Sequence, residues 1–260
     1  MSSVKSPILL LRGINSDSRY WLDFPDEFSD EIKLLIVDLP GTGKNIASKT
    51  PLSISDHVNF LRNEINAEDL SRGIHIIGLS LGGMIAIQWL SMFPNEIKSV
   101  TAMSSTGGKI YSSIRRINPV NWFKLTFSIA TDKIFRTNSF SKKLVSIVTN
   151  IHNNEPRKNW IATKFSNLSM ESRVSIFSTC RQIIAASNWS PDFSDSPELG
   201  KRVLLLKAKY DRFIPPKAVN RLHNMIPNSV LYEIPSGHQI SLSHPDEVIE
   251  LSISHFMDWE

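Results

Sequence analysis

Ser80 lies at the centre of the pentad Gly78-Leu79-Ser80-Leu81-Gly82, between a short apolar run and an apolar pattern at helical spacing. A Gly-x-Ser-x-Gly pentad between a strand and a helix is typical of a sharp turn that presents a nucleophilic serine. We expect side chains at Gly78 and Gly82 to collide with the neighbouring strand and helix. Ser80 is therefore predicted to be strained at a helix N-terminus, whose dipole favours the negative charge of acyl transfer.

His238 is the histidine best placed to act as a base for this serine. A serine hydroxyl needs a base to take its proton, and a carboxylate to orient that base. Among the seven histidines, His238 lies in a loop just past the expected strand 230–234. His75 lies inside an expected strand, which indicates a core residue. The others lie in the inserted segment or in or beside expected helices: His57, His152, His223, His244 and His255. The alternative for His238 is a buried loop histidine without a catalytic role.

Asp211 is the matching carboxylate, because it follows the expected strand 203–207 and the carboxyl ends of parallel strands meet at one edge of a sheet. The other place for such an acid, residues 103–107 after the expected strand 100–103, holds no carboxylate. A turn residue paired with Arg212 is the alternative interpretation. The chain order Ser80, Asp211, His238 is the order of the α/β-hydrolase triad.

Two backbone N–H groups are expected to stabilise the oxyanion of an acyl-transfer reaction. One belongs to Leu81, which follows the nucleophile. The other belongs to Ile14, in the loop after the expected first strand 8–11.

Short apolar runs alternate with helical patterns over most of the 260 residues. Strands are expected at 8–11, 34–37, 74–79, 100–103, 203–207 and 230–234. Helices are expected after a cap at Ser53 or Ser55, after Ser80, at 216–225 and at 245–256, with a short interrupted helix at 21–28. Such alternation predicts an α/β fold with a mostly parallel sheet covered by helices on both faces.

Residues 109–190 break this alternation and carry helical apolar stripes instead. One stripe contains Val174, Phe177, Cys180 and Ile184, so Cys180 is expected to face the core. We predict a helical lid at 109–190 over a core formed by 1–108 and 191–260. The lid segment holds 13 Lys and Arg against 3 Asp and Glu, which accounts for the net charge of +4. A solvated basic face is the simpler interpretation, and attraction of an anionic substrate, carrier or membrane surface is the functional one.

Several classes of function are not favoured by the sequence. Basicity confined to one segment argues against nucleic-acid binding, and no apolar run reaches the length of a transmembrane helix. The N-terminal apolar run is too short for a secretory signal and a single cysteine excludes an internal disulfide, so we expect a cytoplasmic protein. The run Gly41-Thr42-Gly43-Lys44 lacks the full spacing of a phosphate-binding loop. No Cys/His cluster has metal-ligand spacing.

The segments LLLRG, VDLPGTG, GLSLGG, AKYDRFIP and SGHQISLSHPDEV resemble the α/β-hydrolase superfamily over essentially the whole chain except 109–190. The resemblance implies a Ser-Asp-His hydrolase with a helical cap, similar to small carboxylesterases and thioesterases that need no cofactor. Ser80 stands where haloalkane dehalogenases carry aspartate, which argues against carbon–halogen cleavage. Relatives usually have His-Gly where this chain has Arg12-Gly13. Arg12 is expected either to form a salt bridge within its loop or to meet a substrate carboxylate.

These observations predict hydrolysis of a carboxylic ester, or of a thioester, through an acyl-enzyme on Ser80. An apolar acyl part is suggested by the lid residues Trp122, Trp160 and Trp189. The alternatives are carbon–carbon bond hydrolysis or a lyase reaction on the same three residues, and a receptor or scaffold that has kept the pocket without turnover.

Overall fold

The computed structural model describes residues 4–107, 145, 148–151, 154–172 and 174–260. Six strands form one sheet in the order β2-β1-β3-β4-β5-β6, and every pairing is parallel. The strands are β1 (Ile8–Leu11), β2 (Leu34–Ile36), β3 (Ile74–Leu79), β4 (Ile97–Met103), β5 (Val203–Ala208) and β6 (Val230–Ile234). The α/β architecture predicted from the alternating pattern is confirmed.

Side chains alternate between the two faces of the sheet, and each face is covered by its own helices. Leu9, Leu11, Ile74 and Ile76 belong to one apolar cluster with residues of α1, α3 and α8. Ile8, Leu10 and Ile77 belong to the other, with η1, η2 and α10. The helices are α1 (Ile54–Glu64), α2 (Ala67–Arg72), α3 (Leu81–Met92), α8 (Pro216–Met225), α9 (Ile240–Ser243) and α10 (Pro245–Met257), and the shorter 3-10 turns are η1 (Ser18–Trp21), η2 (Phe24–Glu27), η3 (Gly43–Asn45) and η4 (Pro197–Arg202).

Local sequence accounts for most of these boundaries. Ser53 caps α1 by accepting the backbone N–H of Asp56, as its position before the helical pattern predicts. The expected helix at 21–28 is instead two 3-10 turns, because Leu22 between them adopts φ 54°. The short helices α2 and α9 were not expected, since four to six residues give no readable periodicity.

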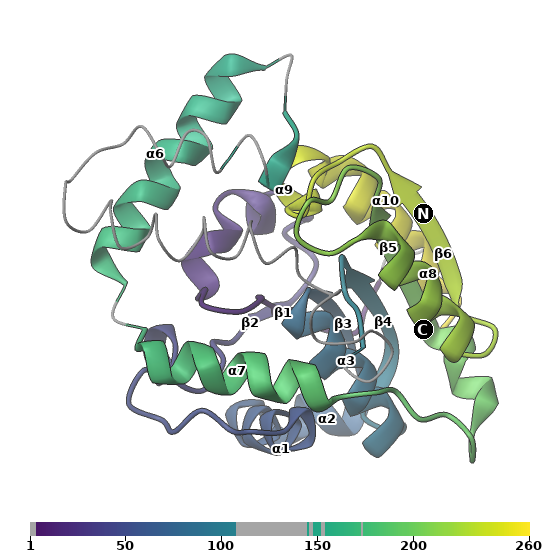
Figure 1. Ribbon diagram of the computed structural model, residues 1–260. Coiled ribbons are helices and arrows are strands. Elements are labelled where there is room, and N and C mark those ends of the chain that lie inside the picture. Colours follow the sequence, from purple (N-terminus) through teal and green to yellow (C-terminus); the bar gives the residue numbers. More distant parts are fainter. Residues whose placement is uncertain (1–3, 108–144, 146–147, 152–153, 173) are drawn as a thin grey trace.

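Two helices of the segment predicted to form a lid are described, α6 (Glu155–Glu171) and α7 (Ile176–Asn188). Figure 1 shows α7 running across the molecule beside α3, with α6 above it. The rest of the expected lid, including Trp122, lies outside the described residues, so its proposed boundaries stay predictions. No helix among the described residues is long and apolar enough to cross a lipid bilayer.

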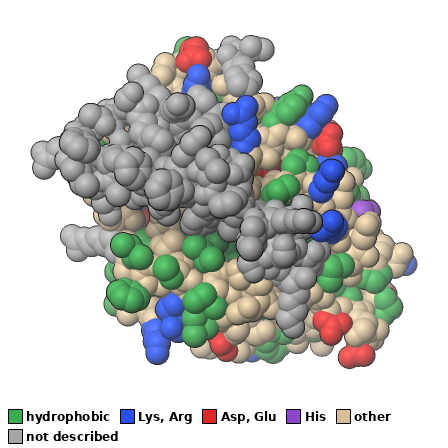
Figure 2. Space-filling model, viewed as in Figure 1, with side chains coloured by type: hydrophobic (Ala, Val, Ile, Leu, Met, Phe, Trp, Pro, Cys, Tyr) green, Lys and Arg blue, Asp and Glu red, His purple; other side chains and the backbone are tan. Residues whose placement is uncertain are grey.

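The predicted orientation of α7 is wrong. Cys180 is exposed, as are Ile176, Phe177 and Ile184, whereas Gln182, Ala185 and Ala186 are buried. Figure 2 shows apolar side chains gathered on the surface over α7. The buried face packs small and polar residues against the loop after β1 and against α3. An apolar stripe identifies residues that share a helix face and leaves open whether that face is covered.

Candidate active site

Ser80 occupies a sharp turn between β3 and α3, with φ 56° and ψ −110°. A non-glycine residue with positive φ is strained, and such strain persists only where the surroundings impose it. Here the backbone N–H of Ser80 donates to Met103 O at 2.8 Å, and Ser105 Oγ donates to Ser80 O at 2.9 Å. The strand-end loop of β4 therefore holds the strained residue in place.

The flanking glycines are required by close backbone contacts. A Cβ at Gly78 would lie 2.4 Å from the carbonyl carbon of Gly82, and a Cβ at Gly82 would lie 2.2 Å from Leu11 O. Distances below 3.0 Å are not found for real Cβ atoms. The collisions expected from the sequence are therefore present, with the helix in one case and with the strand β1 in the other.

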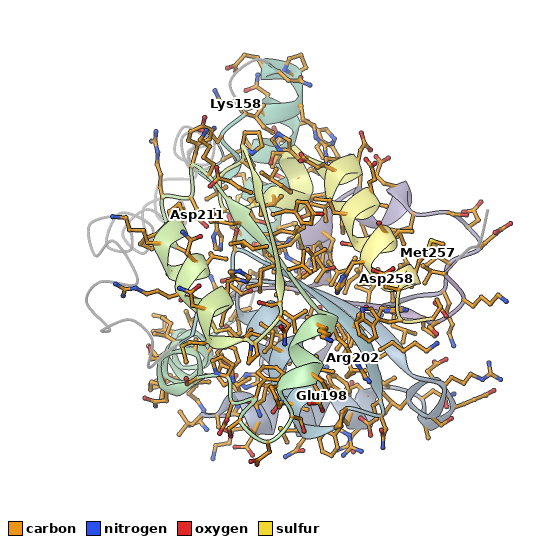
Figure 3. The ribbon with its side chains drawn as sticks, turned by 90° about the vertical axis from the view of Figure 1, so that its right-hand side faces the viewer. Lys158, Glu198, Arg202, Asp211, Met257 and Asp258 are labelled. Atoms are coloured by element: carbon orange, nitrogen blue, oxygen red, sulfur yellow. The ribbon has the colours of Figure 1, made fainter. Side chains whose placement is uncertain are left out.

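Asp211 and His238 are joined by a hydrogen bond between Asp211 Oδ2 and His238 Nδ1, 2.7 Å long. The second oxygen of Asp211 accepts the backbone N–H groups of Phe213 and Ile214 at 2.8 and 2.9 Å. The Asp211 side chain is 2% exposed and that of His238 13%. Figure 3 shows Asp211 beyond the carboxyl end of β5, toward the lid residue Lys158, while Glu198 and Arg202 lie before its amino end. The carboxylate is thus fixed, and its free lone pairs orient the imidazole.

Ser80 is not hydrogen-bonded to His238 among the described residues. Their loops are connected through the loop after β1. A Cβ at Gly13 would lie 3.3 Å from Ser80 Cβ and 3.9 Å from Ser80 Oγ, which places Gly13 directly against the serine. Its neighbour Arg12 donates from Nη2 to Oε1 of Gln239, the residue after His238, at 3.0 Å. The three predicted side chains are therefore brought to one edge of the sheet by adjoining loops.

The N–H groups of Ile14 and Leu81 were predicted to hold an oxyanion. Leu81 is the first residue of α3, and the first N–H groups of a helix have no partner within it. Neither N–H donates a hydrogen bond to another residue in the described ranges. Both N–H groups are thus available to an acceptor outside the protein.

A family described as alpha/beta hydrolase fold matches residues 6–245. The chain belongs to the alpha/beta hydrolase family. The match includes the elbow at Ser80 and the loops that carry Asp211 and His238, and the parallel sheet agrees with it.

Individual members of the alpha/beta hydrolase family resemble this chain only distantly. It is 24% identical over 267 residues to the biotin biosynthesis bifunctional protein BioHC of Teredinibacter turnerae, covering 94% of this chain and 43% of that protein. An esterase from Exiguobacterium antarcticum superposes with TM-score 0.70 at 21% identity, covering 98% and 93% of the two chains. An enol-lactonase from Burkholderia xenovorans superposes with TM-score 0.72 at 14% identity, covering 98% and 92%. The structural likenesses establish the shared fold.

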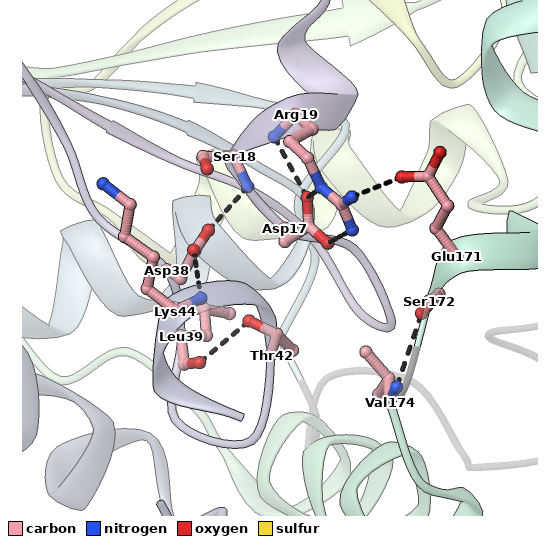
Figure 4. A network of polar contacts seen from close by, with 10 residues as sticks. All are labelled: Asp17, Ser18, Arg19, Asp38, Leu39, Thr42, Lys44, Glu171, Ser172 and Val174. Atoms are coloured by element: carbon pink, nitrogen blue, oxygen red, sulfur yellow. Dashed lines mark hydrogen bonds and ion pairs between the residues drawn. The ribbon is translucent and has the colours of Figure 1, made fainter. Parts of the chain in front are cut away.

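This alpha/beta hydrolase holds the loops of its candidate active site in a polar network that was not predicted from the sequence (Figure 4). Asp17 binds Arg19 through both carboxylate oxygens, and Arg19 reaches Glu171 of α6 at 2.8 Å. Asp38 accepts the backbone N–H groups of Ser18 and Lys44 at 2.6 and 2.8 Å. The network ties the loop after β1 to the loop after β2 and to the lid. The feature of the sequence that could have indicated this network is the position of Asp17 and Asp38 after strands.

The lid helix α7 also contacts the loop after β1. Gln182 Oε1 accepts the backbone N–H of Asn15 at 2.9 Å, and Thr179 Oγ1 donates to Asn15 Oδ1 at 3.1 Å. Asn15 adopts φ 58°, a conformation that asparagine tolerates better than most residues. Because Asn15 follows Ile14, α7 fixes the backbone that carries one predicted oxyanion donor.

The lid tryptophans lie in different surroundings. Trp189 is buried and donates from Nε1 to Gln88 of α3 at 2.6 Å. Trp160 is 37% exposed and lies under the guanidinium of Arg157. The proposal of an apolar acyl-binding part therefore depends mainly on residues outside the described ranges.

Arg12 does not form the salt bridge within its loop that was one expectation from the sequence. The described residues place no carboxylate in ion-pair contact with it.

His75, predicted to be a core residue, is confirmed as one: it is buried and its Nδ1 pairs with Ser99 Oγ at 2.7 Å. No group of three or more potential metal ligands gathers among the described residues.

Proposed function

We propose that this protein is a serine hydrolase that cleaves a carboxylic ester through an acyl-enzyme on Ser80. The observation that carries the proposal is the buried Asp211–His238 hydrogen bond at the sheet edge where Ser80 is held in a strained turn. A strained serine, an oriented imidazole and free backbone N–H groups are the parts that acyl transfer requires.

In the proposed reaction, Ser80 Oγ attacks the ester carbonyl while His238 Nε2 takes the hydroxyl proton. The N–H groups of Ile14 and Leu81 donate to the oxyanion, and Asp211 stabilises the imidazolium through Nδ1. The carbon–oxygen bond to the alcohol then breaks, and His238 gives the proton to the departing alkoxide. Water, deprotonated by His238, attacks the acyl-enzyme carbonyl. The bond from the acyl carbon to Ser80 Oγ then breaks, the carboxylic acid leaves, and His238 returns its proton to Ser80 Oγ.

A fluorophosphonate probe tests this proposal directly, because it reacts with activated serines. We expect the native protein to be labelled and Ser80→Ala to lose the label completely. Ser71→Ala is a matched control, since Ser71 is exposed on α2, and it should label like the native protein. A label that persists in Ser80→Ala places the nucleophile elsewhere. A folded native protein that does not label at all contradicts the proposal.

The leaving group is tested with matched substrates that share one acyl chain: an oxygen ester, a thioester and a diketone. We expect the ester to be hydrolysed with the highest kcat/KM. Turnover of the diketone with none of the ester would replace the proposal by carbon–carbon bond hydrolysis on the same residues.

A further inference from the structure

Arg12 is a buried cation whose only described partners are neutral. Arg12 is 3% exposed and lies between the end of β1 and Gly13. The guanidinium lies 4.7 Å from the centroid of the Trp21 ring, and Nη2 donates to Gln239. A cation over an aromatic face gains less free energy than removal of the charge from water costs, so these contacts do not offset the burial of Arg12.

Most of the hydrogen-bonding capacity of Arg12 is unused. Nε and Nη1 are buried and meet no acceptor among the described residues. The nearby carboxylate of Asp17 is engaged by Arg19 through both oxygens. Burial lowers the pKa of Arg12 to about 9, against the opposing effect of the nearby Asp17 carboxylate, which leaves the guanidinium protonated at neutral pH. A protonated guanidinium that forms no ion pair among the described residues is a group that an anion would complete.

Trp21, which contacts Arg12, and Gln182, which contacts the loop after β1 at Asn15, also have buried donors without acceptors. Trp21, which stacks under Arg12, has an unpaired Nε1–H. Gln182 uses Oε1 for the Asn15 N–H, so its orientation is fixed, and its Nε2 has no partner among the described residues. All these unmet groups are N–H donors. Such donors are satisfied by a ligand with several hydrogen-bond acceptor atoms, and an anion has them.

The location of these donors relates them to the reaction. Arg12 precedes Gly13, which lies against Ser80, and it bonds the residue that follows His238. Binding of a group at Arg12 therefore involves the same loop that lies against Ser80 and contacts the loop of His238.

We propose that Arg12 and Trp21 form a subsite for a carboxylate carried by the ester substrate, an inference that rests on the proposed ester hydrolysis. The planar guanidinium matches a carboxylate and pairs with it by charge-assisted hydrogen bonds. A monoanion also balances the single positive charge of Arg12, whereas a phosphate dianion would leave one negative charge buried. The preferred substrate is therefore an ester with a second, ionised acid group.

The test uses three p-nitrophenyl esters of equal chain length whose acyl chains end in a methyl, a carboxylate or a phosphonate group. The native protein is expected to show a kcat/KM at least tenfold higher for the carboxylate-ended than for the methyl-ended ester. In Arg12→Met this ratio should fall at least tenfold, mainly through KM, and Arg12→Lys should recover part of it. Arg72→Met is the matched control: Arg72 is exposed on α2, before β3, and its loss changes net charge equally. Its ratio should stay at the native value.

A direct binding measurement on Ser80→Ala makes the test independent of turnover and of how well Arg12→Met folds. Calorimetry should show at least tenfold tighter binding of the carboxylate-ended ester than of the methyl-ended one. Equal affinities overturn the inference, as does a preference for the phosphonate. An Arg12→Met variant whose activity falls equally on all three esters also overturns it, because Arg12 would then only support the His238 loop. Failure of fluorophosphonate labelling, in contrast, would reject the proposed serine chemistry while the binding preference still reports on the subsite.

Discussion

Asp211 divides its two carboxylate oxygens between its own loop and His238. Oδ1 accepts two backbone N–H groups, of Phe213 and Ile214, and Oδ2 accepts Nδ1–H of His238 at 2.7 Å. The first set fixes the carboxylate and the second fixes the tautomer of the imidazole, leaving Nε2 free to accept a proton.

The substitution Asp211→Asn separates these two tasks. An amide oxygen can still accept the loop N–H groups, but its NH₂ faces Nδ1 and favours the wrong tautomer. We expect kcat to fall by about 10²–10⁴-fold with a small change in unfolding free energy. Ester hydrolysis and urea denaturation measure the two effects, with Asp30→Asn on an exposed loop as control. Unchanged kcat would mean that Asp211 has no part in catalysis.

Gly82→Ala is predicted to destroy the elbow. The added Cβ would lie 2.2 Å from Leu11 O, a backbone atom that cannot move aside. We expect a loss of about 2–3 kcal/mol in unfolding free energy and no fluorophosphonate labelling. Gly73→Ala is the control, since its Cβ meets only the flexible Lys98 side chain at 3.1 Å and its φ of 80° costs about 1 kcal/mol. A labelled, stable Gly82→Ala protein would contradict the close packing at the elbow.

The contact of α7 with the loop after β1 should influence the reaction. Gln182→Leu removes the acceptor of the Asn15 N–H and frees the backbone beside Ile14. We expect kcat to fall by about tenfold, because complete loss of one oxyanion donor costs about 10²–10³-fold and a displaced donor costs less. Ile184→Ala, on the exposed face of the same helix, should leave kcat unchanged. Equal kcat in both variants would show that the contact does not reach the reaction.

Stability should fall in mild acid because of His75. Burial among β3 and α10 lowers the pKa of His75 to about 4, and this outweighs the opposing contact with Glu260. The unfolded chain therefore binds more protons than the folded chain. The contribution of His75 to the free energy of unfolding is complete above about pH 6.5 and is lost as the pH falls toward 4. His57 and His255, whose pKa values burial also lowers, act with the same sign. Unfolding free energies between pH 7 and 4 should decline less steeply in His75→Gln than in the native protein.

The exposure of Cys180 is open to a simple chemical check. The chain has one cysteine, and it lies on the outer face of α7. A thiol reagent should modify one group per chain in the folded protein. The rate of modification should be within a few-fold of the rate in the denatured protein. Modification that waits for unfolding would instead support the core-facing position predicted from the sequence.

The strands were predictable because buried parallel strands carry short, uninterrupted apolar runs, as in Ile74–Leu79. Ser80 and Asp211 were selected as candidates because each follows such a strand, and His238 because it lies just past the edge strand β6. Arg12 was noticed as an unusual residue, but its stacking on Trp21 depends on the folded loop and its bond to Gln239 joins residues far apart in sequence. The face of α7 was misjudged for a related reason. Periodicity carries no information about which surface a helix meets, and the partner here is a polar loop at Asn15.

The parallel pairing of β4 with β5, with Val100 opposite Val203, brings together strands separated by roughly a hundred residues. The entropy of closing such a long connection grows only logarithmically, so doubling its length costs about 0.6 kcal/mol. The sheet is therefore nearly indifferent to the length of what lies between these strands. Replacing the connection between β4 and β5 by that of a relative should be a practical route to altered substrate selection, provided that the polar contacts to Asn15 and Arg19 are kept.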